Sequence, residues 1–136
     1  EEEIYYSIFK KALCIKQIKP HFPINELVEA YEFRPSRSEA IYEIIKHYRE
    51  QGFYNTAYSL CKRQMNRPKS NDILFIDKTI YDYKLLDELG VCSYWVGEYE
   101  ESLKASEELL KNPHLPEIHR PRIEENKKFA ENKIQE

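Results

Sequence analysis

Glycine is scarce in this chain, and several other shortages narrow what the protein can be. The 136 residues include three glycines and three cysteines, and the cysteines form no Cys-x-x-Cys pair. Isolated cysteines among apolar residues favour small buried side chains in a reducing compartment over a disulfide framework. No apolar run approaches the ~18–20 residues that a membrane-spanning helix needs. The first residues, EEEIYY, also lack the basic and apolar regions of a signal peptide.

An excess of one charge is missing as well. Lys and Arg number 21 against 24 Asp and Glu, for a formal net charge of −3, so nucleic acid is a poor first hypothesis for a partner. Hydrophobic residues make up 41% of the chain and aromatic residues 13%, which excludes a disordered chain and allows one compact domain. The only methionine is Met65, so we expect a processed chain or a fragment of a longer one.

Helical periodicity dominates the sequence, and strand-like alternation is rare. Prolines and glycines divide the chain into segments of helix length. We expect an all-α fold in a single domain, residues 1–136, built of antiparallel helical hairpins stacked as a short solenoid. The expected elements are a helix over 3–17 that stops near Pro20, a helix over 24–33, hairpins over about 36–66 and about 77–111, and a capping helix over about 117–134.

Two glycines carry the argument for the hairpins. Gly52 and Gly97 each end a helical stretch and are each followed two residues later by a tyrosine. We expect both in the left-handed conformation, joining antiparallel helices through very short turns. Ser36 and Glu39 fit the S-x-x-E capping box at the start of the first hairpin. In its second helix the side chains expected to face inward are Ala57, Leu60, Cys61 and Met65.

Aligning the two glycines reveals a repeated pattern. The alignment pairs Ile41 with Leu86, Ile44 with Leu89, Tyr54 with Tyr99, and Ala57 with Ser102. The pattern resembles the tetratricopeptide repeat, in which small residues let two helices approach closely. Gly90 is the small residue of the second unit, whereas Ile45 holds that place in the first, so we expect the first hairpin to pack less closely. Gly52 and Gly97 are farther apart than the ~34 residues of one tetratricopeptide repeat, which indicates an insertion around 66–77.

A more specific resemblance covers about residues 34–101. The motifs that carry it are RPSRSEAIYEIIKHYR, GFYNTAY, RPKSNDILFIDKTIYDY and LLDELGVCSYWVGEY. They are similar to the tetratricopeptide-like helical region that follows the catalytic domain in family-2-type glycosyltransferases of bacteria, fungi and giant DNA viruses. The structural motif residues expected on this basis are Arg34, Arg37, Glu39, Gly52, Ala57, Gly90 and Gly97.

The resemblance implies a parent enzyme and a setting for this chain. The chain would lie on the C-terminal side of a glycosyltransferase whose catalytic domain is its partner in cis, with a protein or glycan acceptor as a further partner. The parent would use a nucleotide sugar and a divalent metal. The implied location is the cytoplasm, of a host cell if the source is viral.

Residues that would support catalysis within this chain are missing. No Asp-x-Asp pair occurs, although two close carboxylates are needed to fix a divalent cation between protein and phosphates. Of the four histidines only His114 and His119 lie near each other, without a third ligand for zinc. No P-loop, GxGxxG or GxSxG motif is present. We therefore expect no catalytic site, metal site or cofactor here, and a self-contained hydrolase or transferase is the least favoured alternative.

Binding features are better supported. In tetratricopeptide hairpins the first helix lines the concave face. The positions expected there are Glu39, Tyr42, Lys46 and Arg49 in the first unit, and Lys84, Asp87, Val91, Tyr94 and Trp95 in the second. Aromatic rings beside Arg and Lys suit a peptide, a carboxylate or a sugar. The alternative is that Tyr94 and Trp95 only pack beneath a neighbouring helix. Arg34 and Arg37 could likewise bind phosphate or pair with carboxylates such as Glu39 and Glu88.

The leading functional expectation is a non-catalytic, tetratricopeptide-like accessory domain of a glycosyltransferase. It would position the acceptor, a partner or the catalytic domain, without nucleic acid or membrane as a partner. The alternative is a free-standing tetratricopeptide adaptor that binds a peptide.

Overall fold

The computed structural model describes residues 1–18 and 21–136, and in this part of the chain the regular structure is helical, with no strand. The all-α expectation is confirmed, whereas the expected stop near Pro20 lies outside the described residues. The elements are α1 (Glu2–Ile18), α2 (Ile24–Phe33), α3 (Glu39–Glu50), α4 (Tyr54–Met65), the π-helical turn η1 (Ile80–Lys84), α5 (Leu85–Trp95), α6 (Tyr99–Lys111), the 3₁₀ turn η2 (Glu117–His119) and α7 (Arg120–Gln135).

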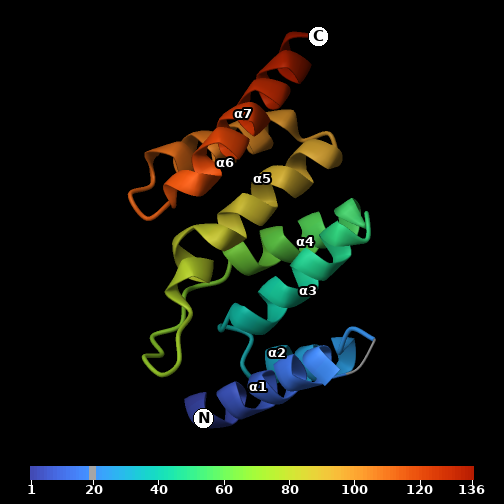
Figure 1. The fold of residues 1–136 in the computed structure, drawn as a ribbon, viewed down its shortest axis with the longest axis vertical. Helices are drawn as coiled ribbons and strands as arrows, with labels where there is room; N and C mark the ends of the chain where they lie inside the picture. The colour runs from blue at the N-terminus through green and yellow to red at the C-terminus, as the bar shows by residue number, and fades with distance from the viewer. Residues whose placement is uncertain (19–20) are drawn as a thin grey trace.

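The helices follow one another along the long axis of the molecule, from α1 and α2 at one end to α7 at the other (Figure 1). Each α-helix packs against the next one in the chain. In addition α3 contacts α5, and α5 contacts α7. Alternate helices therefore form a second set of neighbours, and this arrangement brings faces of α3, α5 and α7 to one side of the molecule.

The two glycine turns have the same backbone structure. Gly52 has a φ of +82° and Gly97 a φ of +89°, so the expected left-handed conformation is confirmed at both sites. At each turn the glycine N–H bonds back three residues and the next N–H bonds back five, the pattern of a Schellman motif. These bonds run from Gly52 and Phe53 to the carbonyls of Arg49 and Tyr48, and from Gly97 and Glu98 to those of Tyr94 and Ser93.

Two local expectations are wrong. The capping box does not form, because α3 begins at Glu39 and its N-cap, Ser38, makes no side-chain capping bond. The Glu39 carboxylate instead accepts hydrogen bonds from Arg37. Met65 is 39% exposed rather than inward, because it is the last residue of α4 and has no helix covering it.

A buried ion network ties the inserted segment to the start of the first hairpin. The Arg37 side chain is 0% exposed and donates to Glu39 at 3.1 and 3.2 Å and to Asp72 at 3.3 Å. Arg34 donates to both carboxylate oxygens of Asp72 at 2.6 Å. These bonds, led by that of Arg34, lower the pKa of Asp72 to about 2. Both arginines therefore have structural partners, and Glu39, 2% exposed, belongs to this network rather than to a binding face.

The crossing of α5 and α6 is close because one residue lacks a side chain. A Cβ added at Gly90 would lie 3.4 Å from the Ala105 Cβ. The Ser102 hydroxyl donates to the Gly90 carbonyl at 2.8 Å. Small residues at these positions bring the two helix backbones together, as the sequence pattern predicts for the second hairpin.

Candidate functional site

Three helices each present one row of side chains to a common surface. In each row the residues lie at spacing i, i+4 and i+7, which places them on one face of a helix. The rows are Tyr42, Lys46 and Arg49 on α3; Asp87, Val91 and Tyr94 on α5; and Arg122, Asn126 and Phe129 on α7. We call the surface formed by these nine residues the three-helix groove.

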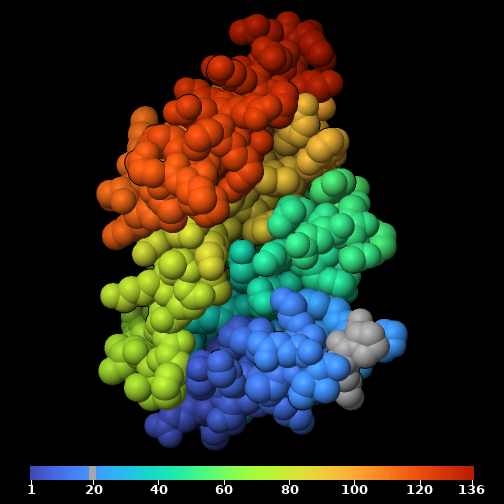
Figure 2. Space-filling view, in the orientation of Figure 1, coloured from blue at the N-terminus to red at the C-terminus, as the bar shows by residue number. Residues whose placement is uncertain are grey.

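The groove consists of two neighbouring cavities. The larger, about 440 Å³, lies among α3, α5 and α7, and the smaller, about 110 Å³, lies toward the Gly97 turn. Val91 and Asn126 line both cavities, so the two meet at these side chains. Figure 2 shows a hollow in the molecular surface where α3, α5 and α7 approach one another.

An ion pair between the two hairpins forms part of the groove wall. Arg49 donates to both oxygens of Glu88, at 2.5 and 3.1 Å. Burial raises the pKa of Glu88 even though Arg49 acts in the opposite direction. Removing the solvent from a carboxylate disfavours its charged form, and here that effect exceeds the attraction of the guanidinium. Arg49 is therefore a structural partner of Glu88 as well as a lining residue.

A second ion pair closes the groove on the side of α7. Arg122 donates to the two carboxylate oxygens of Asp87 at 3.0 and 2.6 Å. The hydrogen bonding to Asp87 raises the pKa of Arg122. The pair is partly exposed, so its contribution to stability is small, at most about 1 kcal/mol. Its geometric effect is to hold α7 in register with α5.

The remaining polar groups of the larger cavity are available to a ligand. Lys46 makes no ion pair within the described residues. Burial, followed by the charge of Glu88, raises the pKa of Tyr42, so its phenol is protonated at neutral pH. An ammonium, a phenol and the Asn126 amide therefore line one cavity, and all three can donate hydrogen bonds to acceptor oxygens.

The smaller cavity has an aromatic rim. Trp95 is 58% exposed and stacks on Tyr54 with ring centroids 5.3 Å apart. Tyr94 meets Trp95 edge to face at 5.4 Å, and Phe129 lies 6.3 Å from Tyr94. Trp95 is thus held by its neighbours without being covered. Such rings offer flat apolar faces to an incoming side chain or sugar.

Seven of the nine positions expected on the concave face line one of these two cavities. Those that line the larger are Tyr42, Lys46, Arg49, Asp87 and Val91, and those that line the smaller are Val91, Tyr94 and Trp95. Lys84 lines neither, because it belongs to η1, where the wider π-helical turn changes the angular position of its side chain. Of the two carboxylates suggested as partners for Arg34 and Arg37, Glu39 does pair with Arg37, whereas Glu88 pairs with Arg49 instead.

Sequence reasoning missed the contribution of α7. Arg122, Asn126 and Phe129 repeat the spacing of the rows on α3 and α5 and, like them, have a charged residue at one end and an aromatic one at the other; that shared pattern is the signal that could have found them. The apolar residues of α7 lie in two different environments. Ile123 and Ala130 are buried, whereas Phe129 and Ile134 are exposed.

The described residues contain no group of three or more His, Cys, Asp or Glu side chains arranged to hold a metal ion. Within the same residues no helix is both long and apolar enough to cross a membrane. Comparison with protein-family models, with curated proteins and with solved structures gives no match for this chain.

Proposed function

We propose that this chain is a non-catalytic, tetratricopeptide-like interaction domain that holds an extended segment of a partner in the three-helix groove. The observation that carries the proposal is the convergence of three rows with the same spacing on one surface. The two hairpins with matching turns support the repeat character of the domain.

The groove chemistry defines the partner segment. Lys46, Tyr42 and Asn126 favour a carboxylate or carbonyl oxygen at one end. Trp95 and Phe129 favour an aromatic or aliphatic group at the other end. A peptide with an acidic residue a few positions from an apolar one fits both requirements.

The proposed setting is a glycosyltransferase, in which the domain positions the acceptor, a partner or the catalytic domain. It rests on the motif resemblance over residues 34–101 and on the groove. The second candidate is a free-standing adaptor that binds a peptide. The parent reading frame discriminates between the two: an upstream strand-rich domain with Asp-x-Asp supports the transferase setting, and a helical repeat alone supports the adaptor.

The binding proposal is tested by selecting short random peptides on the domain and measuring their affinities by calorimetry. Enriched peptides should combine a carboxylate with an aromatic residue. Asn126→Trp places a large ring where the two cavities meet and should weaken binding by at least about tenfold. Lys128→Trp puts the same ring on the exposed face of α7 and serves as the matched control.

Both variants should keep the thermal midpoint of the parent domain, because neither position carries a hydrogen bond or an ion pair within the described residues. Equal binding by the two variants would show that the groove is not the peptide site. The interaction-domain proposal would then be abandoned.

A further inference from the structure

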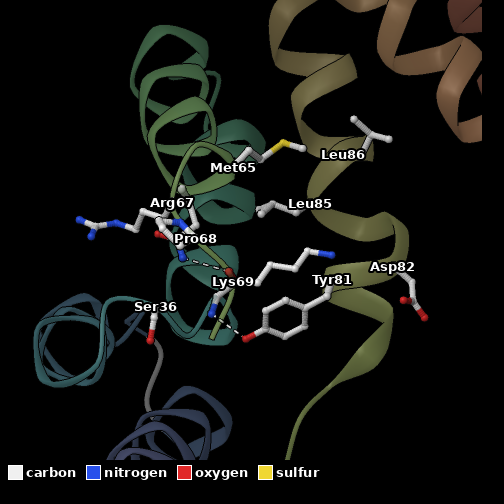
Figure 3. A pocket seen from close by; sticks show the side chains of 11 residues that line it. Ser36, Met65, Arg67, Pro68, Lys69, Tyr81, Asp82, Leu85 and Leu86 are labelled. Carbon is white, nitrogen blue, oxygen red and sulfur yellow. Dashed lines mark hydrogen bonds between the residues drawn. The ribbon is translucent and has the colours of Figure 1, made fainter. Parts of the chain in front are cut away.

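A cavity of about 180 Å³ lies beside α5, outside the three-helix groove. It is bounded by the end of α4, the segment after it and the start of α5 (Figure 3). Met65, Leu85 and Leu86 supply apolar walls, but the Arg67 guanidinium points away from the cavity. Its polar groups therefore do not converge on one ligand. The apolar surface left exposed on α1 is the stronger feature.

Two apolar faces run along α1. The first is buried against the rest of the molecule and consists of Tyr5, Phe9 and Ala12. The second follows heptad spacing, with steps of four and three residues, and so lies along one side of the helix. Its members, which we call the isoleucine stripe, are Ile4, Ile8, Lys11, Ile15 and Ile18. Ile4 is 52% and Ile18 81% exposed, while Ile8 and Ile15 are half-buried.

The position of α1 makes this stripe unusual. The helix belongs to one end of the stack, and α7 forms the other end (Figure 1). The outer side of α7 carries the exposed charges of Glu124, Glu125 and Lys128, as a capping helix of a solenoid requires for solubility. The stripe on α1 instead leaves two large isoleucines facing solvent, and an exposed apolar row of this kind marks an interaction surface.

The charges of α1 indicate what covers the stripe. Glu2 and Glu3 lie in its first turn, and Lys16 lies in its last turn with its side chain 43% exposed. A parallel pair of α1 helices would place Lys11 on Lys11 and one acidic turn on the other. An antiparallel pair places each acidic turn beside the basic end of the other copy and also opposes the helix dipoles. The helix is therefore complementary to itself in the antiparallel orientation.

We propose that two copies of this chain associate through their isoleucine stripes, with the two α1 helices antiparallel about a twofold axis. In the register that overlaps the helices most fully, Ile4 of one copy lies opposite Ile15 of the other. Lys11 then lies opposite Ile8, where its methylene stem covers apolar surface and its ammonium reaches solvent. The contact uses no residue of the three-helix groove, so it does not depend on the function proposed above.

Sedimentation equilibrium of the full chain tests the association. The stripe is about 20 Å long, so the contact is small and the dimer is weak, with an expected dissociation constant of about 10–500 μM. The apparent mass should rise from that of one chain toward that of two between about 5 μM and about 1 mM. A chain that stays monomeric over this range would overturn the proposal.

Two neighbouring lysines provide a matched pair of variants. Lys10 and Lys11 are both exposed, and neither makes an ion pair within the described residues, so both variants should keep the fold. Lys11→Ile completes the apolar stripe and should tighten the dimer by at least about tenfold. Lys10→Ile adds the same side chain outside the stripe and should leave the dissociation constant unchanged. Equal tightening by the two variants would refute the stripe as the contact.

A second matched pair tests the loss of the contact. Ile18 is 81% exposed on the stripe, and Ile118 is 83% exposed far along the chain, before α7. Ile18→Glu should weaken the dimer by at least about tenfold, whereas Ile118→Glu should not change it. Both should keep the thermal midpoint, because neither side chain is buried. Dimerisation that survives Ile18→Glu unchanged would count against the proposal, and Asn126→Trp should leave dimerisation intact.

Disulfide formation between substituted chains tests the orientation. The Ile4→Cys and Ile15→Cys chains are prepared with Cys14→Ser, which removes the exposed native thiol. Oxidation of their mixture should join one chain of each kind, as mass spectrometry of the linked product detects. Each chain oxidised alone should link to itself far less. Efficient linking of each kind to itself would show a parallel pair and overturn the antiparallel arrangement.

Discussion

The two hairpins, α3–α4 and α5–α6, have matching turns but different entries. Gly52 and Gly97 make the same pair of backbone bonds with nearly the same φ. The chain enters α3 through the buried network of Arg37 with Glu39 and Asp72, whereas it enters α5 through the π-helical turn η1. A short turn motif thus determines how two helices reverse direction, and the residues before each hairpin determine what that hairpin is joined to.

The helix crossings differ as well. In the second hairpin Gly90 lets Ala105 and Ser102 come close to the α5 backbone. In the first hairpin the aligned position is Ile45, fully buried in the core with Ala57. The same type of turn therefore joins two different helix crossings. The α3–α4 crossing is filled by the large side chain of Ile45, whereas the α5–α6 crossing is close because Gly90 has no side chain.

The largest effect should come from the entry to the first hairpin. Arg37→Ala leaves the Glu39 carboxylate buried without its cation, while Asp72 keeps Arg34, and should lower the free energy of unfolding by about 3–5 kcal/mol. Arg122→Ala removes an equally well-aligned but half-exposed pair with Asp87 and should cost at most about 1 kcal/mol. Urea denaturation measures both variants. Similar losses for the two arginines would contradict the distinction between a buried network and a surface pair.

The next effect concerns the crossings. Gly90→Val adds atoms beyond a Cβ that already lies 3.4 Å from Ala105, and should destabilise the protein by about 1–3 kcal/mol. Gly90→Ala should be neutral or stabilising, because that contact is an ordinary one and alanine gains up to about 1 kcal/mol of helix propensity over glycine. Thermal denaturation of the pair checks this, and a stability loss in Gly90→Ala as large as that in Gly90→Val would show that the crossing tolerates no side chain.

A smaller effect should be the same in both hairpins. Gly52→Val and Gly97→Val each force a β-branched residue into the left-handed region and should each cost about 1–2 kcal/mol. A Cβ at either position meets no atom within 4 Å, so the cost is that of the backbone conformation alone. The two values, from denaturant titration, should agree within about 0.5 kcal/mol. A clear inequality would mean that the turns are not equivalent.

The subtlest effect should be a difference in pH dependence between the two ion networks. The lowered pKa of Asp72 supplies stability above its unfolded pKa near 4, and this stability is lost as the pH falls toward about 2. The raised pKa of Glu88 has the opposite sign: the folded state favours the protonated form, so stability is lost as the pH rises through the raised value.

Stability curves of Glu88→Gln against pH isolate the second contribution. Relative to the wild type, the variant should lack the loss that begins above about pH 4.3, the usual pKa of a free glutamate. Asp72→Asn should instead lack the loss below about pH 4. The assignment of signs fails if the two variants change the same limb of the curve.

Much of the fold could be predicted from local chemistry. Glycine followed by an aromatic or acidic residue and then tyrosine predicted both turns, because the left-handed conformation is a property of the local backbone. The capping box at Ser36 was wrong because the Glu39 carboxylate has stronger partners, Arg37 and Tyr81, that only the tertiary structure brings to it. Local pattern cannot rank such competing partners.

Only part of the candidate site could be predicted from the sequence. The rows on α3 and α5 follow from their position relative to Gly52 and Gly97, and helical spacing carries that information. The row on α7 required knowing that α7 packs beside α5, which no residue near Arg122 or Asn126 specifies. The unpaired buried atoms of Gln64 and Arg67 could not be predicted, because they become visible only once the other hydrogen bonds of the described residues have been assigned.

The anchoring of the inserted segment has a consequence for the order of folding. The Glu2 carboxylate accepts hydrogen bonds from the backbone of Ile73 and Leu74, and the Tyr6 ring stacks on Phe75 at 4.3 Å. These contacts join residues about seventy positions apart, and contacts of such high sequence separation slow folding because a long loop must close first. During synthesis the start of α1 therefore finds these partners only after the whole first hairpin and the segment that follows it have been made.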